Sequence, residues 1–428
     1  MKKRYWIYGF LIALTIINYV DRVVLSISSG QIKEDFGLSP VTLGYLFSSF
    51  LWLYFIALIP MGILVDKYGS GKVGGWGTGL FSLATVFTSI SGGFVSLLFC
   101  RLLMGLGEST TYPAGGRVIK EWAPASERGI ATAIFHAGSM LGPALGAITL
   151  GWVVSQFGWR FAFMLTGSLG FIWLILWKIW FRHPGKATWL SPEEKHLILS
   201  SQHAAAQPDD VSTGRLGLRN LLRSHTLWAI AFAHGCAVYT TYLFLTWLPG
   251  YLQLAKGMDI TNSGVFTALP YLGAALLGVI IGVYGDKYLK GKNVAMGQRR
   301  NVVALCLLLS ALILLVPYTN NLFLIILLLT LSLTGCTAAV ASNLSLVNDL
   351  LPSGKDSGTA IAFISTGGNL FGLLAPIVTG YIIAQTNSFN TGFIIAGSLA
   401  IGGSLVVLKL TRKRISKEEE VAHVSFTR

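Results

Sequence analysis

The stretch GILVDKY, residues 62–68, closes a long apolar run and returns 220 residues later as GVYGDKY, residues 282–288. Two further pairs of matching segments follow in the same order at an offset of 229 residues: GIATAIFHAG (129–138) with GTAIAFISTG (358–367), and GWVVSQ (151–156) with GYIIAQ (380–385). A single glycine-rich match would carry little weight. Three matches in order at nearly constant spacing indicate two homologous halves.

Long apolar runs fill both halves. Of the 428 residues, 53% are hydrophobic and 12% are charged, whereas ordinary soluble domains carry about 25% charged residues. A run of about 20 apolar residues can cross a bilayer as a helix. Such runs lie near residues 5–28, 41–65, 73–92, 94–119, 128–155, 160–181, 225–250, 262–285, 300–317, 321–347, 357–384 and 391–411. The sequence therefore predicts an all-α membrane protein with twelve transmembrane helices in two homologous six-helix bundles.

The longest polar stretch separates the two halves. We expect an N-terminal bundle over residues 1–182, a cytoplasmic linker over 183–222, and a C-terminal bundle with a cytoplasmic tail over 223–428. Within the linker, SPEE (191–194) is typical of a helix start, because a capping serine precedes a proline and two acids. We interpret this short surface helix as part of a tether, and a regulatory element is the alternative.

The basic residues are distributed unevenly among the predicted loops. When they are assigned to alternating loops, 26 of the 32 Lys and Arg fall on the side of the N-terminus, three fall on the other side and three lie in spans. By the positive-inside rule both termini are cytoplasmic. The net charge of +14 then reflects topology, and no nucleic-acid partner is expected. Short outer loops without a glycosylation sequon favour a multi-pass protein of a bacterial inner (plasma) membrane.

Four ionisable residues lie deepest in the predicted spans: Asp21, Arg22, Arg101 and Glu108. Each charge costs about 2.5–3.5 kcal/mol at a helix centre, so the four are expected to pair or to face a water-filled cavity. Arg101 and Glu108 are two turns apart on nearly one helix face, yet they cannot easily reach each other. Their partners are therefore expected on another helix, where Asp21 and Arg22 offer one opposite charge each.

This charged cluster has a structural and a functional interpretation. As a static pair of buried salt bridges it would be a poor stabilising device, because apolar replacements of such pairs are often neutral or stabilising. We therefore favour a site for a charged solute that exchanges protons.

The whole chain resembles the major facilitator superfamily, and GILVDKYGSGK (62–72) is similar to the signature of its loop between the second and third helices. Lys67 and Ser70 stand where that signature commonly has arginine. The resemblance implies two six-helix bundles around a midplane site, each bundle a 3+3 inverted repeat. It also implies that this loop locks the closed cytoplasmic face, with Asp66 facing a helix N-terminus and a basic partner.

The gate interpretation extends to both halves of the chain. Asp66 and Lys67 recur as Asp286 and Lys287 in the second Gly-x-x-x-Asp-Lys-Tyr stretch. We interpret all four as gating residues, and simple charges at the membrane edge are the alternative.

Four segments resemble the anion:cation symporter branch of that superfamily. They are NYVDR (18–22), SSFLWLYFIALIP (48–60), RLLMGLGESTTYPAGGRVIKEWAPASERG (101–129) and LFLTWLPGYL (243–252). The branch includes bacterial transporters for galactonate, glucarate and hexuronates, and the animal sialin and vesicular glutamate relatives. The chain departs from it at ESTTYP (108–113), where small apolar residues and Phe are more common.

The branch resemblance implies a role for each of the four buried charges. Arg22 and Arg101 would bind the substrate carboxylate and pair internally, whereas Asp21 and Glu108 would be the protonation sites. With both carboxylates ionised the four charges cancel. Protonating both leaves two positive charges and frees the arginines for an anion.

Polar and aromatic residues in other predicted spans complete the candidate site. Hydroxyl and amide groups suit a hydroxylated solute, although helices also use such residues to bind one another. The candidates are Tyr45, Tyr54, Ser342, Asn343, Ser365 and Asn369. The family resemblance reaches Tyr54, whereas Ser365 stands where asparagine is common.

Together these features predict a proton-coupled symporter that imports an organic anion by alternating access. A sugar acid fits best, either an aldonate, an aldarate or a hexuronate. The alternatives are a transporter of phthalate or tartrate and a non-transporting membrane sensor of the same fold. No catalytic constellation indicates an enzyme.

We expect no metal and no cofactor. The cysteines all fall in predicted spans without metal-binding spacing, at Cys100, Cys236, Cys306 and Cys336. The expected partners are a small organic anion, protons and the lipid bilayer, and the protein is expected to be a monomer.

Overall fold

The computed structural model describes residues 3–204, 218–291, 297–351, 356–412 and 414–415. Every regular element within these residues is a helix, and no strand occurs among them. The chain divides into two compact units. Unit 1 comprises Met1–Asp209 and Leu245–Ala268, and unit 2 comprises Asp210–Phe244 and Leu269–Arg428.

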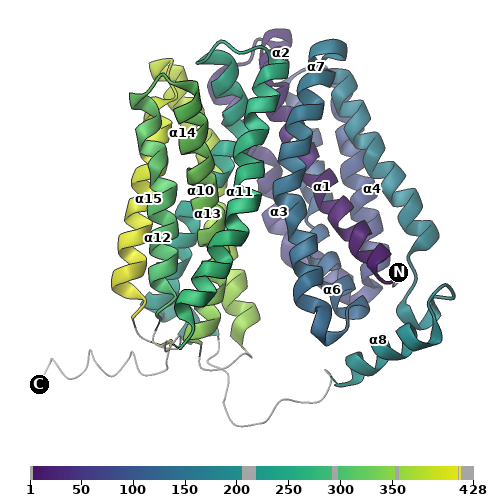
Figure 1. Cartoon of the computed structure of the whole chain (residues 1–428). Helices are drawn as coiled ribbons and strands as arrows, with labels where there is room; N and C mark the ends of the chain where they lie inside the picture. The colour runs from purple at the N-terminus through teal and green to yellow at the C-terminus, as the bar shows by residue number, and fades with distance from the viewer. Residues whose placement is uncertain (1–2, 205–217, 292–296, 352–355, 413, 416–428) are drawn as a thin grey trace, which may run out of the picture. The chain divides into compact units, whose positions relative to one another are not determined.

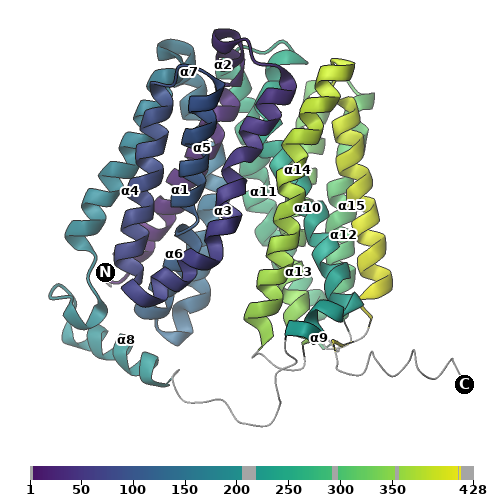
Figure 2. The same ribbon diagram turned by 180° about the vertical axis from the view of Figure 1, so that it is seen from behind.

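Unit 1 contains the helices that arise from the first six apolar runs (Figures 1 and 2). They are α1 (Tyr5–Ile27), α2 (Ser29–Phe36), α3 (Pro40–Tyr68), α4 (Ser70–Ser89), α5 (Phe94–Glu108), α6 (Thr111–Trp122), η1 (Ala125–Glu127), α7 (Arg128–Trp180), η2 (Pro184–Lys186) and α8 (Pro192–Ala204). The end of α10 (His225–Leu254) also belongs to unit 1, and Ser26 of α1 donates a hydrogen bond to the carbonyl oxygen of Thr246 there (2.6 Å).

Two of the predicted spans or loops in this unit contain a break in the helix. Gly158 divides the 53-residue α7 with φ 79° and ψ 168°, a conformation that glycine adopts without steric cost. This break lies in the loop predicted between the spans 128–155 and 160–181. The span predicted over 94–119 is interrupted as well, because α5 ends at Glu108 and α6 begins at Thr111.

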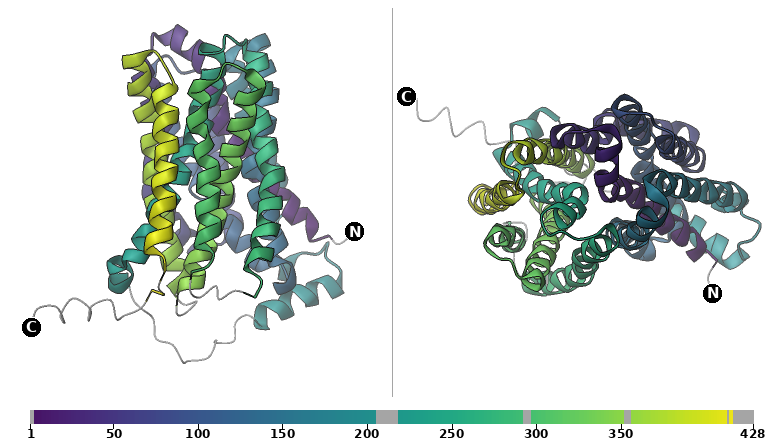
Figure 3. Two further views of the ribbon diagram at one scale, coloured as in Figure 1. Left: turned by 60° about the vertical axis from the view of Figure 1, so that its left-hand side comes forward. Right: turned by 90° about the horizontal axis from the view of Figure 1, so that it is seen from above.

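Unit 2 contains the later spans, which Figure 3 shows from the side and end-on. Its elements are α9 (Leu218–Arg223), the first part of α10 (His225–Leu254), the later part of α11 (Ile260–Leu289), α12 (Arg300–Ser310), η4 (Ala311–Tyr318), α13 (Leu322–Leu350), α14 (Ser357–Thr386) and α15 (Asn390–Leu410). The span predicted over 300–317 is formed by α12 and the 3-10 helix η4 that continues it.

The helices have the length and the surface of membrane spans. In the described part of the chain, nine helical stretches are long and apolar enough to cross a bilayer, and one of them, Ala125–Trp180, covers two predicted spans. The glycine-rich α4 and the broken α5–α6 pair account for the two remaining predicted spans. Large apolar side chains also face outward, as in Ile56, Ile59 and Ile63 on α3, which are 63–72% exposed. The chain is therefore a multi-pass membrane protein, as predicted.

Close packing positions the helix that carries two of the four buried charges. A Cβ atom on Gly138 or Gly142 of α7 would overlap Thr15, Ile16 or Tyr19 of α1. The Thr15 hydroxyl donates to the carbonyl oxygen of Phe135 on α7 (2.8 Å). Small residues that allow such backbone approach are typical of helix contacts in membranes.

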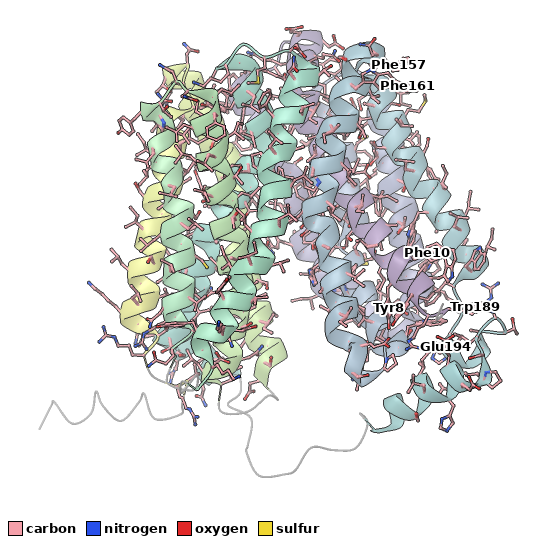
Figure 4. The ribbon with its side chains drawn as sticks, in the orientation of Figure 1. Tyr8, Phe10, Phe157, Phe161, Trp189 and Glu194 are labelled. Carbon is pink, nitrogen blue, oxygen red and sulfur yellow. The ribbon has the colours of Figure 1, made fainter. Side chains whose placement is uncertain are left out.

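The predicted linker helix is confirmed as α8, and the Ser191 hydroxyl accepts a hydrogen bond from the backbone N–H of Glu194 (3.2 Å). Buried Arg4 holds α8 to the start of α1, because it pairs with Glu194 (2.9 Å) and with Glu127 (2.7 Å). Figure 4 shows Glu194 at the same end of unit 1 as the first turns of α1. The hydrogen bond to Glu127 also raises the pKa of the Arg4 guanidinium above its usual value.

Replacing Gly105 with alanine should destabilise unit 1. Gly105 lies on α5, and a Cβ atom there would overlap the carbonyl oxygen of Phe50 on α3. Overpacking of this kind costs about 1–3 kcal/mol of unfolding free energy, so the melting temperature of the purified protein should fall. Gly116→Ala is the matched control, because a Cβ atom on Gly116 meets nothing within 4 Å. Equal melting temperatures for both variants would contradict this account of the α3–α5 contact.

Candidate functional site

The four buried charges all lie in unit 1, on two helices. Asp21 and Arg22 lie on α1, and Arg101 and Glu108 lie on α5. None of the four is more than 5% exposed. Each therefore has to find compensation inside the protein, because water does not solvate it.

Arg22 and Glu108 form a direct ion pair between α1 and α5. The Nη2 and Nε atoms of Arg22 lie 2.7 Å and 2.8 Å from the same carboxylate oxygen of Glu108, Oε2. The other oxygen, Oε1, has no hydrogen-bond partner within the described residues. Pairing across helices is confirmed for these two residues. One carboxylate oxygen accepts from Nε and lies at ion-pair distance from Nη2, while the second is open to a proton.

The expected pairing of Asp21 with Arg101 is wrong as a direct contact. Asp21 Oδ2 accepts a hydrogen bond from the Thr85 hydroxyl on α4 (3.2 Å), and its Oδ1 has no partner in the described structure. Arg101 donates to the backbone oxygen of Asp21 (3.5 Å) and to the sulfur of Met104 (3.1 Å). Neighbours on an α-helix point about 100° apart. Because Arg22 points toward α5, the adjacent Asp21 carboxylate points toward α4.

Aromatic rings surround the two guanidinium groups. The Cζ atoms of Arg22 and Arg101 lie 4.9 Å and 5.1 Å from the ring centroid of Phe50. The rings of Tyr19 (4.7 Å) and Tyr54 (5.6 Å) also face Arg22. Each such cation–π contact stabilises by about 0.5–2 kcal/mol. Both guanidinium groups therefore lie against the ring of Phe50.

Sequence reasoning missed three of these neighbours. Tyr19 and Phe50 stand inside the quoted segments NYVDR and SSFLWLY, so the segments identified their neighbourhood but not their contacts. Nothing in the sequence distinguished Thr85, which contacts Asp21, from the many other hydroxyl side chains in the predicted spans.

The predicted site residues of α3 lie at different heights. Tyr54 is 7% exposed and faces Arg22, as described above. Tyr45 is half-buried nine residues earlier, roughly 14 Å along the helix axis at 1.5 Å per residue. Its carbonyl oxygen accepts a hydrogen bond from the Ser48 hydroxyl (3.1 Å). Tyr54 thus lies in the charged cluster, whereas Tyr45 lies well along the helix from it.

The other predicted substrate-binding residues lie in unit 2, on α13 and α14. Asn343 is buried, and its amide donates to the carbonyl oxygen of Ile230 on α10 (2.8 Å), which is the helix-joining role that the alternative interpretation expected. Its Oδ1 atom has no partner among the described residues. Ser342, Ser365 and Asn369 are half-buried, the last two one turn apart on α14. Their substrate-binding roles stay predictions.

The repeated Asp-Lys-Tyr segments form corresponding ion-pair networks in the two units. In unit 1, Arg117 pairs with Asp66 (2.5 Å) and with Glu121 (2.9 Å). In unit 2, Arg299 pairs with Asp286 (3.4 Å) and with Asp349. The basic partner expected for Asp66 is thus present.

The aspartates of the two repeats form ion pairs, whereas no ion pair is found for their lysines among the described residues. Lys67 lies 5.3 Å from the ring centroid of its neighbour Tyr68. Lys287 is exposed at the end of α11. The gating roles of both lysines and both aspartates stay predictions.

No group of three or more His, Cys, Asp or Glu within the described ranges could hold a metal ion.

The family model described as the Major Facilitator Superfamily matches residues 11–297 and, in a second match, residues 264–426. The chain belongs to the major facilitator superfamily. Among solved structures, this major facilitator chain is similar to a bacterial homologue of the human lysosomal transporter Spinster, with a TM-score of 0.72 and 16% sequence identity. The similarity covers 95% of each chain and shows the shared fold.

Several curated relatives of this major facilitator protein match along nearly its whole length. A protein named as a probable galactarate/D-glucarate transporter of Escherichia coli is 31% identical, covering 95% of this chain and 93% of the relative. A D-galactonate transporter of Escherichia coli is 30% identical, covering 96% of each. A probable sulfoacetate transporter of Cupriavidus necator is 31% identical, covering 95% and 94%. The family and these relatives identify the chain as a transporter rather than an enzyme.

Proposed function

We propose that this protein is a proton-coupled symporter that imports a sugar acid by alternating access. The Arg22–Glu108 ion pair, buried beside Asp21 and Arg101, is the observation that carries the proposal. The substrate class follows from the relatives, which are named for galactarate, glucarate and galactonate.

The geometry of the ion pair supports coupling between a proton and an anion. While Glu108 is ionised, it accepts the Nε hydrogen of Arg22 and forms an ion pair with its Nη2 atom. A proton on Oε1, the unpartnered oxygen, removes the carboxylate charge and weakens both contacts. Arg22 then becomes available to a substrate carboxylate beside the ring of Phe50, which Arg101 also contacts. Release of the proton would restore the ion pair and expel the anion.

Asp21 supplies a second proton site in this proposal. Its carboxylate accepts from the Thr85 hydroxyl and forms no ion pair among the described residues. A proton on this carboxylate would remove a buried charge that no ion pair compensates. The substrate hydroxyls would bind Tyr54, Tyr45 and the polar residues of α13 and α14.

The membrane orientation belongs to the same proposal. The distribution of basic residues supports two cytoplasmic termini in a bacterial inner membrane. We also propose that the protein acts as a monomer with bundles over residues 1–182 and 223–428. The paired Asp66, Lys67, Asp286 and Lys287 would then lock and release the cytoplasmic face.

Uptake by purified protein in liposomes should depend on the proton gradient and on the substrate hydroxyls. Galactarate, glucarate or galactonate should compete with the transported substrate and acetate should not, because unpaired buried polar groups cost about 1–3 kcal/mol each. Two such losses weaken binding by well over tenfold. Uptake should rise as the outside pH falls from about 8 to about 6 and collapse with a protonophore, since protonation releases the arginines.

The same assay separates the alternatives. Better competition by phthalate, tartrate or sulfoacetate than by every sugar acid would replace the substrate class. Uptake that follows a sodium gradient and ignores the proton gradient would remove the proposed coupling.

A further inference from the structure

A cavity of about 390 Å³ lies at the end of unit 1 where α3 ends, α4 begins and α7 ends. Its walls include Lys72 and Trp76 of α4, Trp177 and Lys178 of α7, and Arg182 just beyond α7. The Trp177 indole donates to the carbonyl oxygen of Gly71 (3.0 Å), which fixes the start of α4 against the end of α7. The cavity is therefore a built feature of the helix contact. The helix ends that form it lie at the same end of unit 1 as the N-terminus (Figures 1 and 2).

The cavity is strongly cationic. Lys72, Lys178 and Arg182 are exposed and line it, and none of the three forms an ion pair within the described residues. The guanidinium of Arg182 is held in place by the carbonyl oxygens of Lys178 (2.9 Å) and Phe181 (2.8 Å). Three such cations beside one cavity make a site for an anion with several oxygen acceptors.

The carboxylate that lines the cavity does not neutralise these cations. Glu121 accepts from Arg117 Nε (2.9 Å) and from the Ser70 hydroxyl (2.8 Å), so its charge is already compensated. The first turn of α4 adds to the positive potential, because Gly69 at its N-cap offers no side-chain acceptor.

The exposed apolar side chains beside the cavity distinguish a lipid phosphate from a free phosphate. Trp76, one turn after Lys72, is 65% exposed, and Ile175 and Ile179 on α7 are 57% and 60% exposed. Exposed apolar side chains next to Trp, Lys and Arg mark the edge of the hydrocarbon layer. An anion bound here thus has its charged group in the cavity and an apolar surface directly beside it. A free phosphate would use only the first of these features.

We propose that this cavity binds the headgroup phosphate of an anionic phospholipid, with the acyl chains along the exposed apolar faces of α4 and α7. Lys72, Lys178 and Arg182 hold the phosphate, and Trp76 packs against the glycerol and the first methylenes. Basic pockets between membrane helices are suited to such headgroups. The site is separate from the Arg22–Glu108 cluster and independent of which solute is transported.

The test measures lipid binding to the full-length protein in detergent, with native mass spectrometry as the readout. Neither substrate nor a proton gradient is present. The probes are phosphatidylglycerol, phosphatidylcholine and inorganic phosphate. We expect one saturable phosphatidylglycerol site that phosphatidylcholine does not fill. Each cation near a lipid phosphate contributes about fivefold in affinity. Lys72→Gln combined with Lys178→Gln should therefore weaken phosphatidylglycerol binding about twenty-fivefold.

The matched control combines Lys120→Gln with Lys290→Gln, two exposed lysines that lose the same charge and do not line the cavity. Binding by this control should match the unmodified protein. Arg182→Gln gives a second measurement if the double variant does not fold, with a loss of about fivefold expected. Unchanged binding in the cavity variants, or an equal loss in the control, would overturn the proposal. Displacement by inorganic phosphate at the concentration of phosphatidylglycerol would show a free-phosphate site instead.

Discussion

Glu108→Gln should reduce substrate accumulation driven by a pH gradient to the level of empty liposomes. Glutamine keeps the shape of the side chain, so it can still accept one hydrogen bond from Arg22, but it cannot take up and release a proton. Arg22 would be held less tightly, because a neutral acceptor binds a guanidinium more weakly than a carboxylate does. Substrate binding and exchange of inside for outside substrate should therefore survive. The two assays are pH-driven uptake and counterflow in the same liposomes.

Glu34→Gln is the matched control, because Glu34 is exposed on α2 outside the charged cluster. It should accumulate substrate as the unmodified protein does. Asp21→Asn should also lose pH-driven uptake if Asp21 is the second proton site. Accumulation at the unmodified level in both the Glu108 and the Asp21 variant would remove both carboxylates from the coupling mechanism.

The number and the places of the membrane helices were predictable, because a span needs a long apolar run. The predicted break between 155 and 160 coincides with Gly158. The sequence did not predict α2, a short polar helix over Ser29–Phe36, or the interruption after Glu108. At both places the backbone hydrogen bonds stay local, as from the Leu38 N–H to the carbonyl oxygen of Lys33 and from the Ser109 N–H to that of Gly105. The apolar pattern of the sequence gives the position of a span, but it does not predict such short local changes in helix geometry.

The candidate site was predictable in its charges but not in its contacts. The free-energy cost of burying a charge predicted partners for Arg22 and Glu108, and the two residues form an ion pair with each other. The cost of burial does not determine the direction in which a side chain points from its helix. The expected Asp21–Arg101 contact is therefore wrong, and the contact of both arginines with the ring of Phe50 was not predicted. Helix rotation is fixed by tertiary packing, here by contacts such as that between Gly105 and Phe50.

Arg22 and Arg101 should respond differently to the same substitution. Arg22→Gln leaves Glu108 buried without its ion pair, and breaking a buried pair costs about 3–5 kcal/mol. This variant should lose both substrate binding and thermal stability. Arg101 makes no ion pair within the described structure, and its donors reach a backbone oxygen and a sulfur. Arg101→Gln should therefore melt much closer to the unmodified protein while binding substrate at least tenfold more weakly, since hydrogen bonds to charged groups contribute about 1.5–3 kcal/mol.

The two variants are each other's control, because each removes one buried positive charge near the ring of Phe50. Binding is measured by isothermal titration with the sugar acid that competes best for uptake, and stability by the melting temperature without substrate. Arg22→Lys sharpens the comparison, since lysine keeps the charge but has no planar fork to place two N–H groups on one oxygen. That variant should fold and yet bind poorly. If both glutamine variants bind substrate as the unmodified protein does, neither arginine touches the carboxylate. If Arg101→Gln is instead the less stable of the two, Arg101 compensates a buried negative charge, and Arg22 alone is left to bind the anion.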